Sequence, residues 1–473
     1  MDTNPDRRRS ALIVASAGYF FVLLDVTIVN VALARIGSGL GTSRAELQWV
    51  VDAYALALAA FMLGAGDLAD RLGSRRLFLA GLALFGLASA ACAAAPGAAV
   101  LIAARVAQGL GAAAVLPTSL AIVNQLYPEP EERPRAIGLW AGVGSSALVL
   151  GPVLGGLLVG PLGWRAIFAL NLPLVTASLI AGRRLLPAAR PGPGPGTGAD
   201  VPGQLLGTLA LSALVFALIE GGGAGFGSAP VFAAAAVTLA AFTAFAAVER
   251  RQRRPLLDLR WFSRPEFSGA NAGAGLMNLG TLGALFALSL YLQDERGLSP
   301  LAAGLNLVPL AAPLALLALL SGRLVTRVGP RLPAALGLLA CGAGYLALSR
   351  LEGSIDGPAG WALLALAGSG MGVAVPGLVA GATAALGPDR AGIAAAVNNT
   401  SRQVGGAVGV ALIGGYTSVG ASLLASGLSL TLGGFVALLL MGGLRRFPRR
   451  AAPRGPRCPG ARPRSRASAG APR

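Results

Sequence analysis

The chain contains fourteen stretches of about 20 predominantly apolar residues, separated by short polar segments. An α-helix of about 20 residues crosses the hydrocarbon core of a bilayer, so each stretch predicts one membrane-spanning helix. Six are expected at 11–34, 46–66, 77–95, 98–125, 135–160 and 165–186. After a linker that contains Pro191–Gly196, eight more are expected at 202–220, 229–248, 269–292, 301–321, 331–349, 359–380, 392–413 and 422–444. The expected fold is therefore an all-α polytopic membrane protein with fourteen transmembrane helices.

The composition agrees with lipid as the main solvent of the chain. Of the 473 residues, 55% are hydrophobic and 12% are charged, whereas soluble domains carry about 25% charged residues. All 38 basic residues are Arg, and they stand in short runs between the apolar stretches. This spacing disfavours a nucleic-acid-binding protein, which gathers basic residues on a soluble face.

The Arg residues also predict the orientation, because cytoplasmic loops are richer in Arg than outside loops. If both termini are cytoplasmic, the expected cytoplasmic segments hold 31 of the 38 Arg residues and the expected outside loops hold five. The remaining two, Arg105 and Arg402, fall inside predicted helices. An error of one helix would mix the two groups, so the pattern supports fourteen helices with both termini in the cytoplasm.

Two loops repeat one pattern at an offset of 256 residues. Gly66–Arg75 follows the second predicted helix and Gly322–Arg331 follows the tenth, and both match G-x-L-x-x-R-x-G-x-R. The recurrence predicts two six-helix bundles with parallel topology and a substrate site at their interface. The predicted domains are an N-terminal bundle (1–186), a Pro/Gly linker (187–201), two inserted helices (202–248), a basic loop (249–268), a C-terminal bundle (269–444) and a disordered Arg- and Pro-rich tail (445–473).

Asp25 lies in the middle of the first predicted helix and Arg105 lies inside the fourth. Removal from water disfavours the charged form of a carboxyl group, so Asp25 could bind a proton and release it on the other side of the membrane. The alternative is a structural carboxylate bonded to Asn30 or to a neighbouring backbone group. Arg105 is expected either to form a structural ion pair with an intramembrane carboxylate or to tune its protonation.

Three further ionisable residues have two interpretations each. Asp52 follows Trp49, an interfacial residue type, and is either a residue of the membrane edge or a proton or substrate site. Glu220 ends a predicted helix before three glycines and is either a solvated helix end or a coupling residue. Arg402 either snorkels to the cytoplasmic surface or takes part in conformational change.

Two segments are candidates for gating. Asp70 could face the N-terminus of a helix in the opposite bundle, where the helix dipole favours an anion, and so form a latch. Arg71, Arg75 and Arg76 are expected to act at least as topogenic charges. In the fifth predicted helix, small residues and a proline allow close helix packing and a bend, namely Gly142, Gly144, Gly151, Pro152, Gly155 and Gly156.

These motifs resemble those of the major facilitator superfamily, and within it the fourteen-span drug:proton antiporter family. The resemblance covers about residues 11–445. It rests on six segments in the family's order, which are Leu24–Leu33, Gly66–Arg76, Arg105–Gly111, Gly142–Gly156, Trp164–Pro173 and Arg402–Gly406. Ala34, Thr326 and Phe226 depart from the family pattern, so the substrate is not carried over.

The resemblance implies a secondary active transporter of the bacterial inner membrane that exports drugs or other small amphipathic compounds by alternating access. It implies proton transfer through Arg105, and a fifth helix that seals against leak. The expected proton-coupling residues are Asp25, Arg105, Asp52 and Glu220. The expected substrate cavity contains Asp25, Asn30, Gln108, Asn398 and Asn399. The expected gating residues are Gly66, Asp70, Arg71, Gly73, Arg75, Gly142, Gly151, Pro152, Gly155, Gly156 and Arg402.

We expect no enzymatic activity, because no nucleophile–base pair or metal-ligand set is visible in the sequence. We expect no cofactor, because the proton gradient would drive transport and the chain has no Lys to form a nucleotide-binding P-loop. The expected partners are a small-molecule substrate and the lipid bilayer, with no nucleic acid, and a monomer is expected. The alternatives are a proton symporter, an exporter of one specific metabolite, and a membrane sensor that transports nothing.

Overall fold

The computed structural model describes residues 5–129, 132–187, 200–252, 257–351, 354–387, 390–416 and 418–443. The predicted disordered tail at 445–473 lies outside the described residues. Of the predicted linker at 187–201, only residues 187, 200 and 201 are described.

The described residues are helical almost throughout and contain no strand. The helices are α1 (Pro5–Leu40), α2 (Arg44–Leu72), α3 (Ser74–Ala93), α4 (Ala98–Leu126), α5 (Arg133–Leu162), α6 (Arg165–Ala169), α7 (Asn171–Leu185), α8 (Val201–Ala224), α9 (Ala229–Arg251), α10 (Pro265–Leu290), α11 (Pro300–Val328), α12 (Arg331–Leu348), α13 (Pro358–Leu386), α14 (Ala391–Ile413) and α15 (Val419–Leu440). Short helical turns are η1 (Leu259–Ser263), η2 (Tyr291–Glu295) and η4 (Met441–Gly443). The all-α prediction is confirmed for this part of the chain.

Thirteen helical segments of the described chain are long and apolar enough to cross a membrane. The segment that the sequence adds as a fourteenth is α14, which has 23 residues but also contains Asn398, Asn399, Arg402 and Gln403. These polar residues lower its hydropathy, although α14 packs between α10 and α2 inside the bundle. The polytopic fold is therefore established, and the count of fourteen stays a prediction.

One expected helix is divided in the structure. The segment predicted at 165–186 forms the single turn α6 and the longer α7, which meet at Leu170. Pro173 has no N–H group and cannot bond the carbonyl of Ala169, where α6 ends. The two pieces still form one candidate span, Arg165–Leu185.

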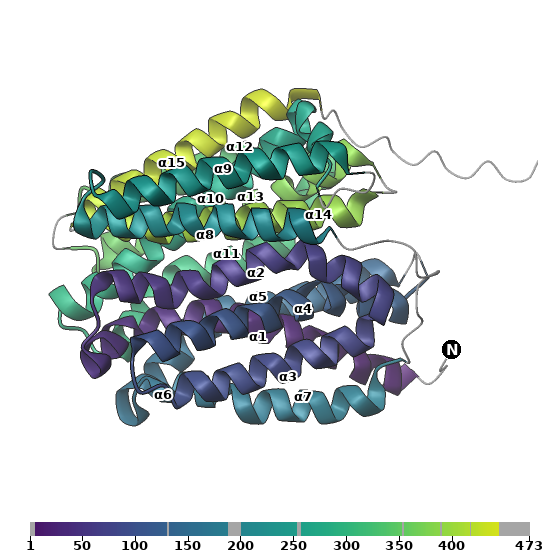
Figure 1. The fold of residues 1–473 in the computed structure, drawn as a ribbon, viewed down its shortest axis with the longest axis horizontal. Coiled ribbons are helices and arrows are strands. Elements are labelled where there is room, and N and C mark those ends of the chain that lie inside the picture. The colour runs from purple at the N-terminus through teal and green to yellow at the C-terminus, as the bar shows by residue number, and fades with distance from the viewer. Residues whose placement is uncertain are drawn as a thin grey trace, which may run out of the picture.

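The helices lie roughly side by side, with α1–α7 on one side of the bundle and α10–α15 on the other (Figure 1). Among the first group α1 packs against α5, α3 against α4 and α2 against α4. Among the second group the same pattern appears as α10 against α14, α12 against α13 and α11 against α13. The two groups meet where α5 packs on α11 and α2 packs on α14, and α8 covers α2 and α14 from the side.

The turns at the two repeated loop motifs have the same construction. Gly73, between α2 and α3, has φ 87°, and Gly329, between α11 and α12, has φ 84°. This backbone conformation favours glycine because a Cβ atom is strained there. Two residues later, Arg75 donates a hydrogen bond to the backbone carbonyl of Arg183 at the end of α7. Arg331 donates in the same way to the carbonyl of Leu438 at the end of α15, at 2.8 Å.

Hydrogen bonds join the two groups at one end of the bundle. This far end is the end at which α1 finishes, opposite the N-terminal end at which α1 begins. Arg44 Nε donates to the carbonyl of Gly414 at 2.7 Å, and Gln48 Nε2 donates to the carbonyl of Val410 at 2.9 Å. Gln293 Nε2 donates to the carbonyl of Val31 at 2.9 Å. The structure is therefore closed between the two groups at its far end.

Candidate functional site

A buried ion pair lies in the middle of the first group of helices. Asp25 on α1 is 0% exposed and Arg105 on α4 is 1% exposed. Arg105 Nη1 donates a hydrogen bond to Asp25 Oδ2, and Arg105 Nε donates to the carbonyl of Val50 on α2 at 2.9 Å. The guanidinium also lies 4.3 Å from the centre of the Tyr54 ring, a cation–π contact. The pair therefore holds α1, α2 and α4 together.

Gln108 completes the contacts of this pair. It lies one turn after Arg105 on α4. Residues three apart share a helix face, so the two side chains lie on the same side of α4. Its Nε2 donates to Asp25 Oδ1 at 2.7 Å and to Ser89 Oγ at 3.0 Å. Its Oε1 accepts from Arg105 Nη1 at 2.7 Å and from Cys92 Sγ at 3.6 Å. Every polar group of this amide is thus occupied, which fixes its orientation.

A second layer of side chains reaches the ion pair from α3 and α7. Ser89 Oγ donates to the carbonyl of Phe85 at 2.8 Å and accepts from Asn171 Nδ2 at 3.3 Å. The network therefore joins α1, α2, α3, α4 and α7 in one polar cluster without solvent contact. The expectation that Arg105 pairs with an intramembrane carboxylate agrees with this geometry, and Asn30 is not the partner of Asp25.

Asp52 on α2 is, like Asp25, a fully buried carboxyl group. It is 0% exposed, and neither of its oxygens has a hydrogen-bond partner among the described residues. Gln48, one turn before it, bonds α14, and Leu56, one turn after it, packs in a cluster with residues of α8 and α14. Asp52 therefore lies on the face of α2 that meets α14 and α8. The structure shows that α8 and α14 cover Asp52, and both interpretations, a residue near the membrane edge and a proton or substrate site, stay predictions.

α14 brings three further predicted residues to the interface of the two groups. Asn398 is buried, and its Nδ2 donates to the carbonyl of Ala270 on α10 at 3.2 Å. Asn399 Nδ2 contacts Met62 Sδ on α2 at 3.3 Å. Arg402 is partly buried, and its Nε is enclosed without a hydrogen-bond acceptor among the described residues. This part of α14 thus faces α10 on one side and α2 on the other.

The remaining predicted polar residues lie apart from these clusters. Asn30 is buried on α1, where its Nδ2 donates to the carbonyl of Val26 at 2.7 Å. Glu220 is partly buried near the far end of α8. The structure thus unites Asp25 and Gln108 in one network, whereas Asn30, Asn398 and Asn399 have other partners. Contact of these residues with a substrate stays a prediction.

The small residues of α5 lie at close helix contacts. A Cβ atom on Gly151 would lie 2.0 Å from Thr27 Oγ1 of α1, and one on Gly156 would lie 2.4 Å from Leu301 Cα of α11. Gly155 faces α1 and Gly142 faces Leu319 of α11. Gly304 of α11 comes so close to Pro152 that a Cβ atom would lie 2.2 Å from its carbonyl oxygen. Tight packing of the fifth predicted helix is confirmed, and its gating role stays a prediction.

The predicted loop motif lies where α2 ends and α3 begins, at the N-terminal end of the bundle. Gly73 and Arg75 build the turn described above, and Arg71 is exposed in the last turn of α2. A Cβ atom on Gly66 would meet no atom within 4 Å, so close packing does not require glycine there. The side chain of Asp70 lies outside the described part of the structure, so the predicted latch stays a prediction.

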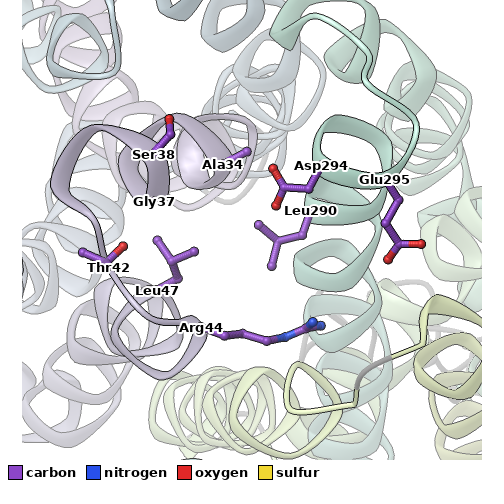
Figure 2. Close-up of a pocket in the computed structure, with 9 residues that line it drawn as sticks. All are labelled: Ala34, Gly37, Ser38, Thr42, Arg44, Leu47, Leu290, Asp294 and Glu295. Carbon is purple, nitrogen blue, oxygen red and sulfur yellow. The ribbon is translucent and has the colours of Figure 1, made fainter.

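A pocket of about 350 Å³ opens at the far end, between the two groups of helices. Figure 2 shows Arg44 and Leu47 of α2 on one wall, with Leu290, Asp294 and Glu295 on another. Ala34, Gly37, Ser38 and Thr42 complete the lining. Arg44, which lines the pocket, also donates one of the hydrogen bonds that close the far end, and no member of the buried ion-pair network lines the pocket.

Sequence reasoning missed several members of the network. Ser89 and Tyr54 are in no motif, and no spacing rule connects them with Asp25. Asn171 does belong to the quoted segment Trp164–Pro173, which was the one available signal. Within the described residues, no group of three or more potential metal ligands occurs.

The chain is similar to known proteins over most of its length. The sequence model described as Major Facilitator Superfamily matches residues 15–410. A methylenomycin A resistance protein of Streptomyces coelicolor is 37% identical over 434 residues, which are 90% of this chain and 91% of that protein. The multidrug resistance protein Stp of Mycobacterium tuberculosis is 38% identical over 423 residues, 89% of this chain and 76% of that protein. The puromycin resistance protein pur8 of Streptomyces alboniger is 39% identical over 414 residues, 86% of this chain and 82% of that protein.

The family match covers most of the chain, and each of these relatives aligns with more than four fifths of it. The many apolar helices agree with this assignment. The chain therefore belongs to the major facilitator superfamily and is a multi-pass membrane transporter.

Proposed function

We propose that the chain exports drugs or other small, largely apolar compounds across the bacterial inner membrane in exchange for protons. The similarity to resistance proteins over most of the chain supports export. The observation that carries proton coupling is the presence of two carboxyl groups that are 0% exposed, Asp25 and Asp52, of which only Asp25 has a counter-ion among the described residues. An ionisable residue inside the membrane is a functional candidate by default because its burial is costly.

Alternating access would arise from two six-helix bundles, α1–α7 and α10–α15, with α8 and α9 inserted between them. The matched helix pairs of the two groups support this division, as do the matched turns at Gly73 and Gly329. With α14 included, the chain has fourteen spans and both termini in the cytoplasm. The far end then faces outward, and the conformation seen is closed to the outside.

Asp52 is the stronger candidate for the carried proton in this conformation. A buried carboxylate without a counter-ion costs several kcal/mol, so the neutral form is the one that fits the environment of Asp52. Asp25 is held by Arg105 and Gln108, and these bonds must break before it can exchange a proton. Asp52 also lies between α2 and α14, where a relative movement of the two bundles would expose it. Glu220, on α8, remains a third candidate.

α5 and α11 are the proposed pivot of this movement. Their backbones touch at Gly156 and Gly304, which permits sliding or rocking without side-chain rearrangement. Asp70, Arg71 and Arg402 complete the proposed gating set. The transporter is proposed to work as a monomer in the lipid bilayer without a cofactor, since each bundle supplies the interface of the other.

The proposal is tested with inverted membrane vesicles whose interior is acidified. Compounds are added one at a time, including methylenomycin A, puromycin, cationic dyes and quaternary ammonium compounds, and release of protons from the vesicles is recorded by fluorescence. We expect release with at least one compound in the wild type and its loss in Asp52→Asn. Glu132→Gln, which changes an exposed carboxylate, serves as the matched control.

Each result has a different consequence. Proton release that survives in Asp52→Asn but is lost in Asp25→Asn would identify Asp25 on α1 as the proton-coupling residue. Proton entry in the opposite direction indicates a symporter and contradicts export. The absence of any response in a folded, inserted protein across the whole panel contradicts proton-coupled export of these compounds.

A further inference from the structure

Arg402 is a cation inside the bundle without a counter-ion. It lies on α14, which packs against α10, α13, α2 and α8. Its Nε is enclosed without an acceptor, and Arg402 makes no hydrogen bond or ion pair to the residues that the structure describes. Arg cannot lose its charge under physiological conditions. An isolated guanidinium in this environment is therefore costly, and an anion that reached it would be stabilised.

Neither Asp25 nor Asp52 serves as its partner. Asp25 is already paired with Arg105. Asp52 makes no ion pair with any described residue, and it lies nearer the far end than Arg402 does. If Asp52 is neutral, as proposed above, these four interior groups carry a net positive charge. The described residues thus supply no anion to balance the charge of Arg402.

An aromatic pair of the opposite bundle lies within electrostatic range of Arg402. Tyr19 on α1 is close enough to Arg402 for an electrostatic interaction. The Tyr19 ring stacks on Trp140 of α5, with 4.2 Å between ring centres and 13° between the planes. Trp140 is itself held by a hydrogen bond from its Nε1 to Ser119 Oγ at 3.2 Å. Gly144 leaves the space that Tyr19 needs, because a Cβ atom there would lie 2.0 Å from Tyr19 Cδ1.

The position of these residues suits a ligand that enters from the N-terminal end. Arg402, Tyr19 and Trp140 are all partly buried, so their side chains retain accessible surface. The hydrogen bonds of Arg44, Gln48 and Gln293 close the far end above them. This closure lies on the far-end side of Arg402 along α14, so it does not stand between the cation and the N-terminal end of the bundle.

We infer that Arg402 binds the acidic group of the exported compound while Tyr19 and Trp140 bind its ring system, so that the substrates are aromatic organic anions. This inference rests on the proposed export function and names its substrate class. A guanidinium recognises a carboxylate through two parallel hydrogen bonds, and a stacked aromatic pair offers a flat apolar surface beside it. Cationic drugs would be repelled by Arg402.

The test measures binding to purified protein in detergent by isothermal titration calorimetry. The probes are benzoate, 2-naphthoate and 9-anthracenecarboxylate, each beside its own neutral amide. We expect the wild type to bind at least one carboxylate about tenfold to hundredfold more tightly than its amide, the range for bonds to a charged group. Arg402→Gln should remove this preference. Arg350→Gln, at an exposed position, is the matched control and should leave it unchanged.

Two further variants separate recognition from folding. Arg402→Lys keeps the charge but loses the planar fork, so it should retain part of the preference. Tyr19→Leu should weaken binding of a carboxylate and its amide by similar factors. If Arg402→Gln does not fold, the results for Arg402→Lys and Tyr19→Leu decide whether these residues recognise the compound. The absence of a carboxylate preference in the wild type across the panel would overturn the inference, as would a preference that persists in Arg402→Gln.

Because the calorimetric test requires no transport, the two proposals fail separately. A protein that releases protons with cationic compounds but shows no carboxylate preference would keep the export function and lose this substrate class. A protein that prefers the carboxylates but never exchanges protons would keep the binding site and lose proton-coupled export.

Discussion

Removal of either partner of the Asp25–Arg105 pair is expected to destabilise the protein by unequal amounts. Asp25→Asn leaves the guanidinium with bonds to Val50 and Gln108 and the ring of Tyr54, but without a counter-ion. Because Arg stays charged, we expect a loss of about 3–5 kcal/mol in the free energy of unfolding. Arg105→Gln leaves a carboxyl group that can take up a proton and keeps its bond to Gln108, so the loss should be about 1.5–3 kcal/mol.

The double variant removes both charges and should be no less stable than Arg105→Gln alone. Its loss is then at least about 3–5 kcal/mol smaller than the sum of the losses in the two single variants. The assay is unfolding in mixed detergent and dodecyl sulfate micelles, followed by tryptophan fluorescence. The partly exposed pair Arg296–Asp356, with 3.1 Å between Nη2 and Oδ2, gives a control cycle with coupling of at most about 1 kcal/mol. Additive losses at Asp25 and Arg105 would refute the buried ion pair.

Three more changes test the packing and the topology. Gly304→Leu should push α11 away from α5 and destabilise the protein by at least about 1–3 kcal/mol in the same unfolding assay, whereas an unchanged midpoint would contradict the close contact. Gln48→Leu removes a bond across the closed far end and should cost about 1 kcal/mol, with faster hydrogen exchange at the end of α14; unaltered exchange there would count against that closure. In a Cys458→Ser background, Ser38→Cys should react with a membrane-impermeant maleimide on intact cells and Arg76→Cys should not, and the reverse pattern would invert the proposed orientation.

The helices could be predicted from the sequence because apolar length and Arg distribution depend on local composition. Their bounds agree with the structure within a few residues at most ends, and larger differences arise where helices such as α1 extend past the apolar core. The division of the predicted helix 165–186 at Leu170 was not predicted, because the effect of Pro173 on the helix was not considered. The ionisable residues of the interior were also visible, because a charge within an apolar stretch is rare.

Their partners were not predictable, because these depend on which helix faces meet in three dimensions. Ser89 joins the Asp25 network only because α3 packs against α4 at that level. The cover over Asp52 was not predicted, because Trp49 was considered only as an interfacial anchor. In the structure the Trp49 ring lies 6.3 Å from Phe216 of α8, which covers this face of α2. The sequence of one helix does not show which other helix packs over it.

Transport in proteoliposomes driven only by an imposed pH gradient tests the central claim most directly. Purified protein is reconstituted, a gradient with an acidic interior is set, and accumulation of a compound that passed the vesicle assay is followed with time. We predict accumulation in the wild type that stops when nigericin collapses the gradient and that is absent in Asp52→Asn. Equal accumulation with and without the gradient would show passive passage and would contradict proton-coupled export.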